Sequence, residues 1–138
     1  LKARLLLLFT ALLVAGAGKM GGALLEGLIS RGLPPSRIVV QDPSPPPEIA
    51  QFLKSNGIRT EATIVSLDAP PSLILAAVKP QVMDQVFAPL AKLAGAKTVV
   101  LSIAAGKTLA SFERHLAPGI AVIRGMPNTP AQVGRGVT

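Results

Sequence analysis

Short apolar runs alternate with amphipathic segments along the whole chain. The apolar runs have strand length and predict strands at residues 7–15, 37–41, 58–60, 73–78, 98–103 and 120–124. Segments with apolar residues three or four positions apart predict helices at residues 19–30, 48–55, 81–93 and 109–116. Strands that alternate with helices in this way are typical of an α/β fold, here a doubly wound, mostly parallel sheet with helices on both faces.

Glycine and proline mark the connections between these elements. Four prolines within residues 42–47 predict a stiff loop without regular structure. Distinctive loop sequences follow five of the predicted strands, at residues 16–21, 42, 78–80, 104–106 and 127–130. Because the carboxyl ends of parallel strands share one edge of the sheet, these loops are expected to meet where such sheets bind ligands.

The segment Gly16-Ala17-Gly18-Lys19-Met20-Gly21 lies between the first predicted strand and the first predicted helix. This Gly-x-Gly-x-x-Gly pattern is typical of a dinucleotide-binding βα unit. The first glycine permits a tight turn, the second a close approach to a pyrophosphate, and the third close packing of the helix on the strand. Asp42 follows Gly21 by 21 residues and is expected to accept a hydrogen bond from a ribose 2′-hydroxyl. The alternative is a glycine-rich turn that holds no ligand.

Composition narrows the function classes. The 138 residues are 49% hydrophobic, which is enough to form a hydrophobic core. We therefore expect a single domain over residues 1–138, in which residues 1–6 form an irregular extension. The chain has no cysteine, so disulfides, thiolate catalysis and cysteine-based metal sites are excluded, and no metal site is expected. The net charge of +7 is scattered without interleaved aromatics. It therefore favours small anionic ligands over nucleic acid, which is not expected as a partner.

The first residues allow a second interpretation. Lys2 and Arg4 precede an apolar stretch, and the small residues 15–17 have the form of a cleavage site, so a signal peptide is an alternative. The apolar stretch is shorter than the ~20 residues of a membrane span, and no membrane association is expected. A buried parallel strand also reads as a continuous apolar run, and we favour this interpretation. A mature protein that began at or after Gly18 would identify the signal peptide.

Five segments, taken in order, resemble the pyrroline-5-carboxylate reductase family. They are Gly16 to Gly21, Ala77-Val78-Lys79-Pro80, Ser102-Ile103-Ala104-Ala105-Gly106, Met126-Pro127-Asn128-Thr129-Pro130 and Gly134-Arg135-Gly136-Val137-Thr138. The resemblance implies a Rossmann-type NAD(P)-binding domain in a cytoplasmic oxidoreductase of proline biosynthesis. The implied reaction is the reduction of 1-pyrroline-5-carboxylate to L-proline with NADPH or NADH.

The resemblance also implies roles for individual residues. The implied cofactor-binding residues are Gly16, Gly18, Lys19, Met20, Gly21, Asp42, Ala77, Val78, Lys79, Pro80, Ala104, Ala105 and Gly106. Asn128 and Thr129 would be the catalytic residues and would form the base of the pocket near the position of hydride transfer. Two alternatives stay open, because Lys79 would also suit a solvated strand end and Asn128 and Thr129 would also suit the cap of a turn. The single histidine, His115, is expected on the surface.

Three departures from the family pattern affect these expectations. Asp42 stands where the family often has small polar residues, which favours NADH, although Arg37 and Ser44 could reverse this preference. Residues 63–65 are mostly apolar where the family often supplies a polar contact to adenosine. The sequence also lacks the helical domain through which family members oligomerise and bind the imino acid. We therefore expect a cofactor-binding half whose activity alone is undecided. The alternatives are a non-catalytic dinucleotide-binding or regulatory module and a β-hydroxyacid-type dehydrogenase.

Overall fold

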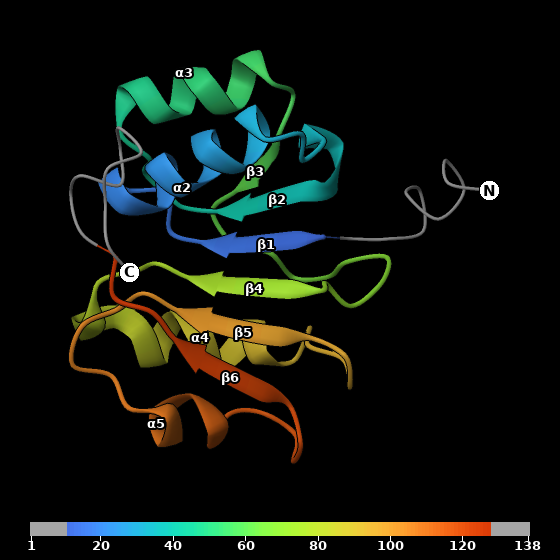
Figure 1. Ribbon diagram of the computed structural model, residues 1–138, viewed down its shortest axis with the longest axis vertical. Coiled ribbons are helices and arrows are strands. Elements are labelled where there is room, and N and C mark those ends of the chain that lie inside the picture. Colours follow the sequence, from blue (N-terminus) through green and yellow to red (C-terminus); the bar gives the residue numbers. More distant parts are fainter. Residues whose placement is uncertain (1–10, 128–138) are drawn as a thin grey trace.

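The computed structural model describes residues 11–127 and arranges them as alternating strands and helices (Figure 1). The first half comprises β1 (Leu12–Ala15), α2 (Lys19–Ser30), a 3-10 turn (Pro35–Arg37), β2 (Ile38–Gln41), α3 (Pro47–Ser55) and β3 (Arg59–Glu61). The second half comprises β4 (Leu73–Ala76), a 3-10 turn (Pro80–Val82), α4 (Met83–Ala91), β5 (Val99–Ser102), α5 (Leu109–Glu113) and β6 (Ala121–Arg124). Residues 1–6, and residues 7–10 of the first predicted strand, lie outside the described part.

Within residues 11–127, the strands form one six-stranded sheet in the order β3-β2-β1-β4-β5-β6. Every neighbouring pair is parallel, and Leu12 of β1 pairs with Ile38 on one side and Leu73 on the other. The chain winds outward from β1 to β3 and then returns to β4 beside β1. This confirms the predicted doubly wound sheet and places the reversal of strand order between β1 and β4, where such folds bind ligands.

Alternate residues of β1, β2, β4 and β5 pack into two separate hydrophobic layers, one on each face of the sheet. In β1, Leu13 packs with the layer that contains Phe87 of α4 and Phe112 of α5, whereas Leu12 packs with the layer that contains Leu25 of α2. Phe87 and Phe112 make an edge-to-face contact with ring centroids 5.1 Å apart and planes at 87°. Helices α2 and α3 lie beside the half of the sheet formed by β1–β3, and α4 and α5 lie beside the half formed by β4–β6 (Figure 1).

Several predicted boundaries were wrong by one to three residues. Pro47 was assigned to the stiff loop but begins α3, because proline is well suited to the first turn of a helix. The predicted helix at 81–93 is a 3-10 turn followed by α4, which ends at Ala91. The predicted helix at 109–116 ends at Glu113. Both helices end early because the next N–H groups bond three residues back, as in Leu93 N to Leu90 O and His115 N to Phe112 O, which tightens the chain.

No helix within residues 11–127 combines the length and apolar character needed to cross a membrane.

Most of the predicted strands begin later or end earlier in the structure than the sequence indicated. For example, β4 stops at Ala76 instead of residue 78, and β5 runs from Val99 to Ser102. The third strand is displaced by one residue from its predicted position and comprises Arg59–Glu61.

Candidate functional site

Two glycines of the loop between β1 and α2 are required by the backbone itself. Gly16 has φ +92°, and a Cβ there would lie 2.9 Å from the carbonyl oxygen of Ala77 and from Val78 Cγ1. A Cβ on Gly21 would overlap the carbonyl oxygen of Gly16 and lie 3.3 Å from the Ala77 side chain. Gly16 therefore makes the turn after β1, and Gly21 lets α2 pack against it, as the sequence pattern predicted.

Gly18 is a different case. Its φ of −76° is accessible to any residue, and no heavy atom lies within 4 Å of where a Cβ would be. Neither backbone strain nor packing within the described chain requires glycine at this position. The missing side chain leaves open space in front of the first turn of α2.

That first turn of α2 has free hydrogen-bonding capacity. Gly18 is the N-cap, no side chain caps the helix, and the first turn holds no acidic residue. Its first bond runs from Gly22 N to Gly18 O at 2.7 Å, so the preceding N–H groups have no partner within the helix. Lys19 is exposed and Met20 is half-buried at this end. Unpaired N–H groups and the positive end of the helix dipole together suit a phosphate anion.

The end of β2 holds the surrounding loops in place. Asp42 Oδ2 accepts a hydrogen bond from the Ala17 N–H at 2.8 Å, and Oδ1 accepts one from the Ser44 N–H at 2.8 Å. The buried side chain of Gln41 accepts a hydrogen bond from the Ile64 N–H at 2.7 Å. Two adjacent side chains therefore tie the glycine loop, the proline-rich loop and the loop after β3 to one strand end.

A cavity of about 250 Å³ opens at this edge of the sheet. It is lined by Gly16, Gln41, Asp42, Pro43, Ala62, Thr63, Val78, Gln85, Val86 and Pro89. Gly16, Asp42 and Val78 are the residues of this lining that the sequence predicted. The α4 residues were missed, because Gln85 and Pro89 look in sequence like an ordinary solvated face and Val86 like part of the apolar face of the helix.

The other predicted cofactor contacts flank this cavity at the carboxyl ends of β4 and β5. Ala77 is half-buried, Lys79 is exposed, and Pro80 begins the 3-10 turn before α4. Ala104 is buried, whereas Ala105 and Gly106 are exposed and Gly106 has φ +75°. The Ile103 N–H donates to the Ala76 carbonyl at 3.1 Å, which keeps these two loops side by side. Asn128 and Thr129 lie outside the described residues.

Asp84 organises a charged cluster on the α4–α5 side. Its carboxylate lies 2.6 Å from Arg114 Nη2 and 3.5 Å from both Lys107 Nζ and His115 Nε2. The hydrogen bond from Arg114 lowers the pKa of Asp84 below its ordinary value, against a smaller opposing effect of desolvation. The His115 side chain is 22% exposed and packs near Phe87, so the histidine expected on the surface is partly buried there.

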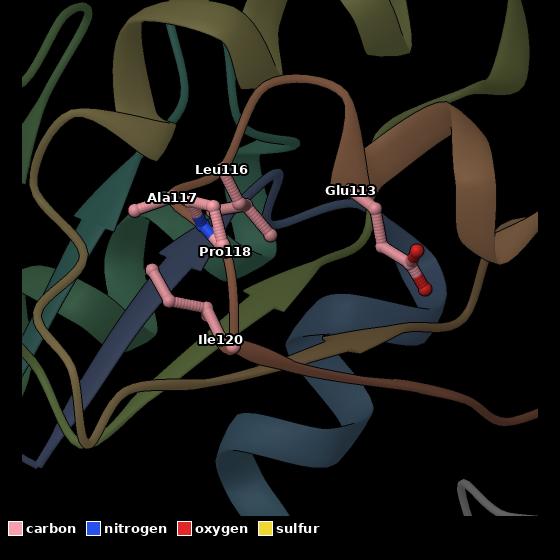
Figure 2. A pocket seen from close by; sticks show the side chains of 6 residues that line it. Glu113, Leu116, Ala117, Pro118 and Ile120 are labelled. Atoms are coloured by element: carbon pink, nitrogen blue, oxygen red, sulfur yellow. The ribbon is translucent and has the colours of Figure 1, made fainter.

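A second cavity, of about 430 Å³, lies at the opposite edge of the sheet (Figure 2). Its lining comprises Glu113, Leu116, Ala117, Pro118, Gly119 and Ile120, which precede β6. It contains none of the predicted site residues. Within residues 11–127 no three acidic or histidine side chains converge in a way that would hold a metal ion.

Residues 11–106, from the start of β1 through the loop after β5, match the family described as NADP oxidoreductase, coenzyme F420-dependent. The chain belongs to this family. The part that matches the NADP oxidoreductase family contains the glycine loop, the end of β2 and both loops that flank the cavity.

Individual proteins and structures agree with this assignment. The chain is 39% identical over 124 residues to the pyrroline-5-carboxylate reductase of Escherichia coli strain K12. The aligned region covers 89% of this chain and 46% of that protein. The structure of a pyrroline-5-carboxylate reductase from Coxiella burnetii superimposes with a TM-score of 0.79 at 30% identity, covering 91% of this chain and 46% of the other. The resemblance indicated by the sequence is therefore confirmed.

A more distant structure shows the same fold. The Plasmodium falciparum pyrroline carboxylate reductase with NADP bound has a TM-score of 0.72 at 23% identity, covering 91% of this chain and 45% of the other. This chain of the NADP oxidoreductase family spans about half the length of the curated relatives that it matches.

Proposed function

We propose that this chain is the dinucleotide-binding half of a pyrroline-5-carboxylate reductase. Gly18 is the observation that carries the proposal, because neither backbone strain nor packing within residues 11–127 requires glycine there, and the missing side chain leaves room before an uncapped helix end. The similarity to pyrroline-5-carboxylate reductases over 89% of the chain supports the choice of reaction. The complete enzyme would reduce 1-pyrroline-5-carboxylate to L-proline with NADPH or NADH.

The cofactor would supply the hydride, and the residues of this chain would bind and orient it. The backbone N–H groups of Gly18, Lys19 and Met20 are proposed to hold the pyrophosphate on the loop shaped by Gly16 and Gly21. Asp42 is proposed to meet the adenosine ribose. The segments 77–80 and 104–106 are proposed to lie beside the nicotinamide, with Asn128 and Thr129 near the hydride position. A protonated imine is already electrophilic, so orientation would contribute more than a strong acid or base.

Further parts of the proposal concern the complete protein. The imino-acid pocket and the contacts between subunits would come from polypeptide outside this sequence, since the relatives are about twice as long. We also propose a cytoplasmic location, as expected for proline biosynthesis.

Calorimetric titration of the folded chain with NADH and NADPH tests the cofactor site. Saturable binding of at least one dinucleotide, without its oxidation when 1-pyrroline-5-carboxylate is added, is the expected result. A folded chain that binds neither dinucleotide overturns the proposal. Turnover by the chain alone would contradict the part of the proposal that places the substrate pocket elsewhere.

A fusion tests the choice of reaction. The chain, joined to the carboxyl-terminal half of the Escherichia coli relative, is expected to oxidise the nicotinamide cofactor when 1-pyrroline-5-carboxylate is added. A folded fusion that binds the cofactor without turnover would favour a non-catalytic dinucleotide-binding module instead.

A further inference from the structure

We infer that Asp42 makes this chain select NADH over NADPH. The inference rests on the proposed dinucleotide site and adds a ranking of its two candidate cofactors. It depends on three features, which are the fixed position of the Asp42 carboxylate, its place in the cavity, and the distribution of positive charge around it.

The carboxylate is held by its own backbone surroundings. One oxygen accepts from the Ala17 N–H and the other from the Ser44 N–H, each at 2.8 Å. An ionised carboxylate has about four acceptor positions and no donor, so two of them stay available. The available positions can accept from a ribose hydroxyl and have nothing to offer a phosphate oxygen.

The carboxylate also lies where an adenosine ribose would be placed. Asp42 lines the cavity of about 250 Å³ together with Gly16, at the start of the glycine loop. The Ala17 N–H that it accepts from is directly adjacent to Gly18, the open position before α2. A dinucleotide with its pyrophosphate at that helix end would bring its adenosine ribose toward the end of β2.

Among residues 11–127, no positive charge that could offset a 2′-phosphate is placed at this cavity. Its described lining contains one carboxylate and no lysine or arginine. Arg59 is the basic residue of the neighbouring strand β3, and its guanidinium bonds Glu61 at 2.6 Å. Arg37 precedes β2, so it stands about five residues, or ~17 Å at ~3.3 Å per residue, from Asp42 at the other end of the strand.

Two further groups could contact a phosphate, but neither lines this cavity. Lys19 lines a separate hollow between α2 and α3 together with Glu26 and Glu48. The Ser44 N–H donates to Asp42 itself. A 2′-phosphate would therefore meet a fixed negative charge at this strand end. Like charges a few ångströms apart near a protein surface weaken binding by about tenfold or more.

The test compares the affinities of NADH and NADPH for the folded chain by calorimetry. We expect NADH to bind at least about tenfold more tightly, and Asp42→Asn to reduce that ratio severalfold or reverse it. Glu113→Gln is the matched control, because it removes one exposed carboxylate from α5 and is expected to leave the ratio unchanged. Added salt should reduce the preference by screening the repulsion.

The possible results separate this inference from the proposed function. Equal or tighter binding of NADPH overturns the selectivity and leaves the dinucleotide site standing. An unchanged ratio in folded Asp42→Asn overturns the role of Asp42, and Asp42→Ser serves as the second variant if the first fails to fold. Binding of neither cofactor overturns the proposed function and the inference with it. NADP is bound in the Plasmodium falciparum structure, so this preference would distinguish the chain from that relative.

Discussion

The backbone of Gly21 lies so close to the carbonyl oxygen of Gly16 that a methyl group on Gly21 would overlap it. This contact joins the first turn of α2 to the turn after β1 and keeps the helix against the sheet. The neighbouring Gly18 has open space in place of such a contact. Glycines three residues apart therefore serve different purposes, and single substitutions can separate them.

Gly21→Ala is expected to destabilise the fold. Overpacking against a fixed carbonyl typically costs about 1–3 kcal/mol, since neither the helix nor the turn can move without loss of other contacts. The free energy of unfolding from urea denaturation measures the effect. Gly27→Ala is the control, because Gly27 lies in the same helix with open space around it, and alanine there should stabilise the helix by up to about 1 kcal/mol. Equal stability of Gly21→Ala and the unmodified chain would contradict this account of the contact.

Gly18→Ala is expected to spare stability and weaken binding. Its free energy of unfolding should change by no more than about 0.5 kcal/mol, because no heavy atom of residues 11–127 lies within 4 Å of the added methyl group. Dinucleotide affinity should fall about tenfold or more, since each charge-assisted hydrogen bond lost with the pyrophosphate is worth about 1.5–3 kcal/mol. Calorimetry on the folded variant measures this change. Unchanged affinity would show that the phosphates do not approach Gly18.

Gln41→Ala is expected to loosen the cavity. The substitution removes the buried acceptor of the Ile64 N–H and leaves that donor unpaired, which costs about 1–3 kcal/mol. Because residues 62 and 63 line the cavity beside Ile64, dinucleotide affinity should fall together with stability. Hydrogen exchange of the Ile64 amide reports the loss directly. Gln81→Ala, at an exposed position outside the cavity lining, should change neither quantity.

The Asp84 cluster predicts a dependence of stability on pH. The folded-state pKa of Asp84 is lowered from the ordinary 3.8, so its contribution to stability is present above that value and is lost as pH falls through the folded-state pKa. Asp84→Asn should therefore lower the melting temperature slightly at neutral pH and have a diminishing effect in acid. The effect is expected to be small because the cluster is largely exposed. A difference that grows toward acid pH would contradict the assignment.

The fold was largely predictable because its central strands β1, β2 and β4 are buried on both faces. Such strands appear in the sequence as continuous apolar runs, and the residues of β1, β2 and β4 follow this rule. The third strand was misplaced by one residue because Arg59 and Glu61 are exposed, so no apolar pattern marks it. Helix ends were misplaced where local hydrogen bonds tighten the last turn, which hydrophobic spacing does not reveal.

Of the cavity lining, the sequence predicted Gly16 of the glycine loop, Asp42 and Val78, and missed the other residues. The hydrogen bond between Asp42 and Ala17 depends on the pairing of Ala15 with Gln41, which brings two strand ends together from distant parts of the chain. Gln85 and Pro89 line the cavity from a helix whose outward positions look, in sequence, like an ordinary solvated face.

The edge-to-face pair of Phe87 and Phe112 also determines how this protein can be observed. The chain contains neither tryptophan nor tyrosine and only four phenylalanines. Its near-ultraviolet circular dichroism must therefore arise from phenylalanine, and two of the four rings are packed together between α4 and α5. Loss of that fine structure, with helical signal retained, would report loosening of this layer specifically. Because the chain has no tryptophan or tyrosine, its own fluorescence is weak, and the fluorescence of a bound reduced nicotinamide can be followed with little background.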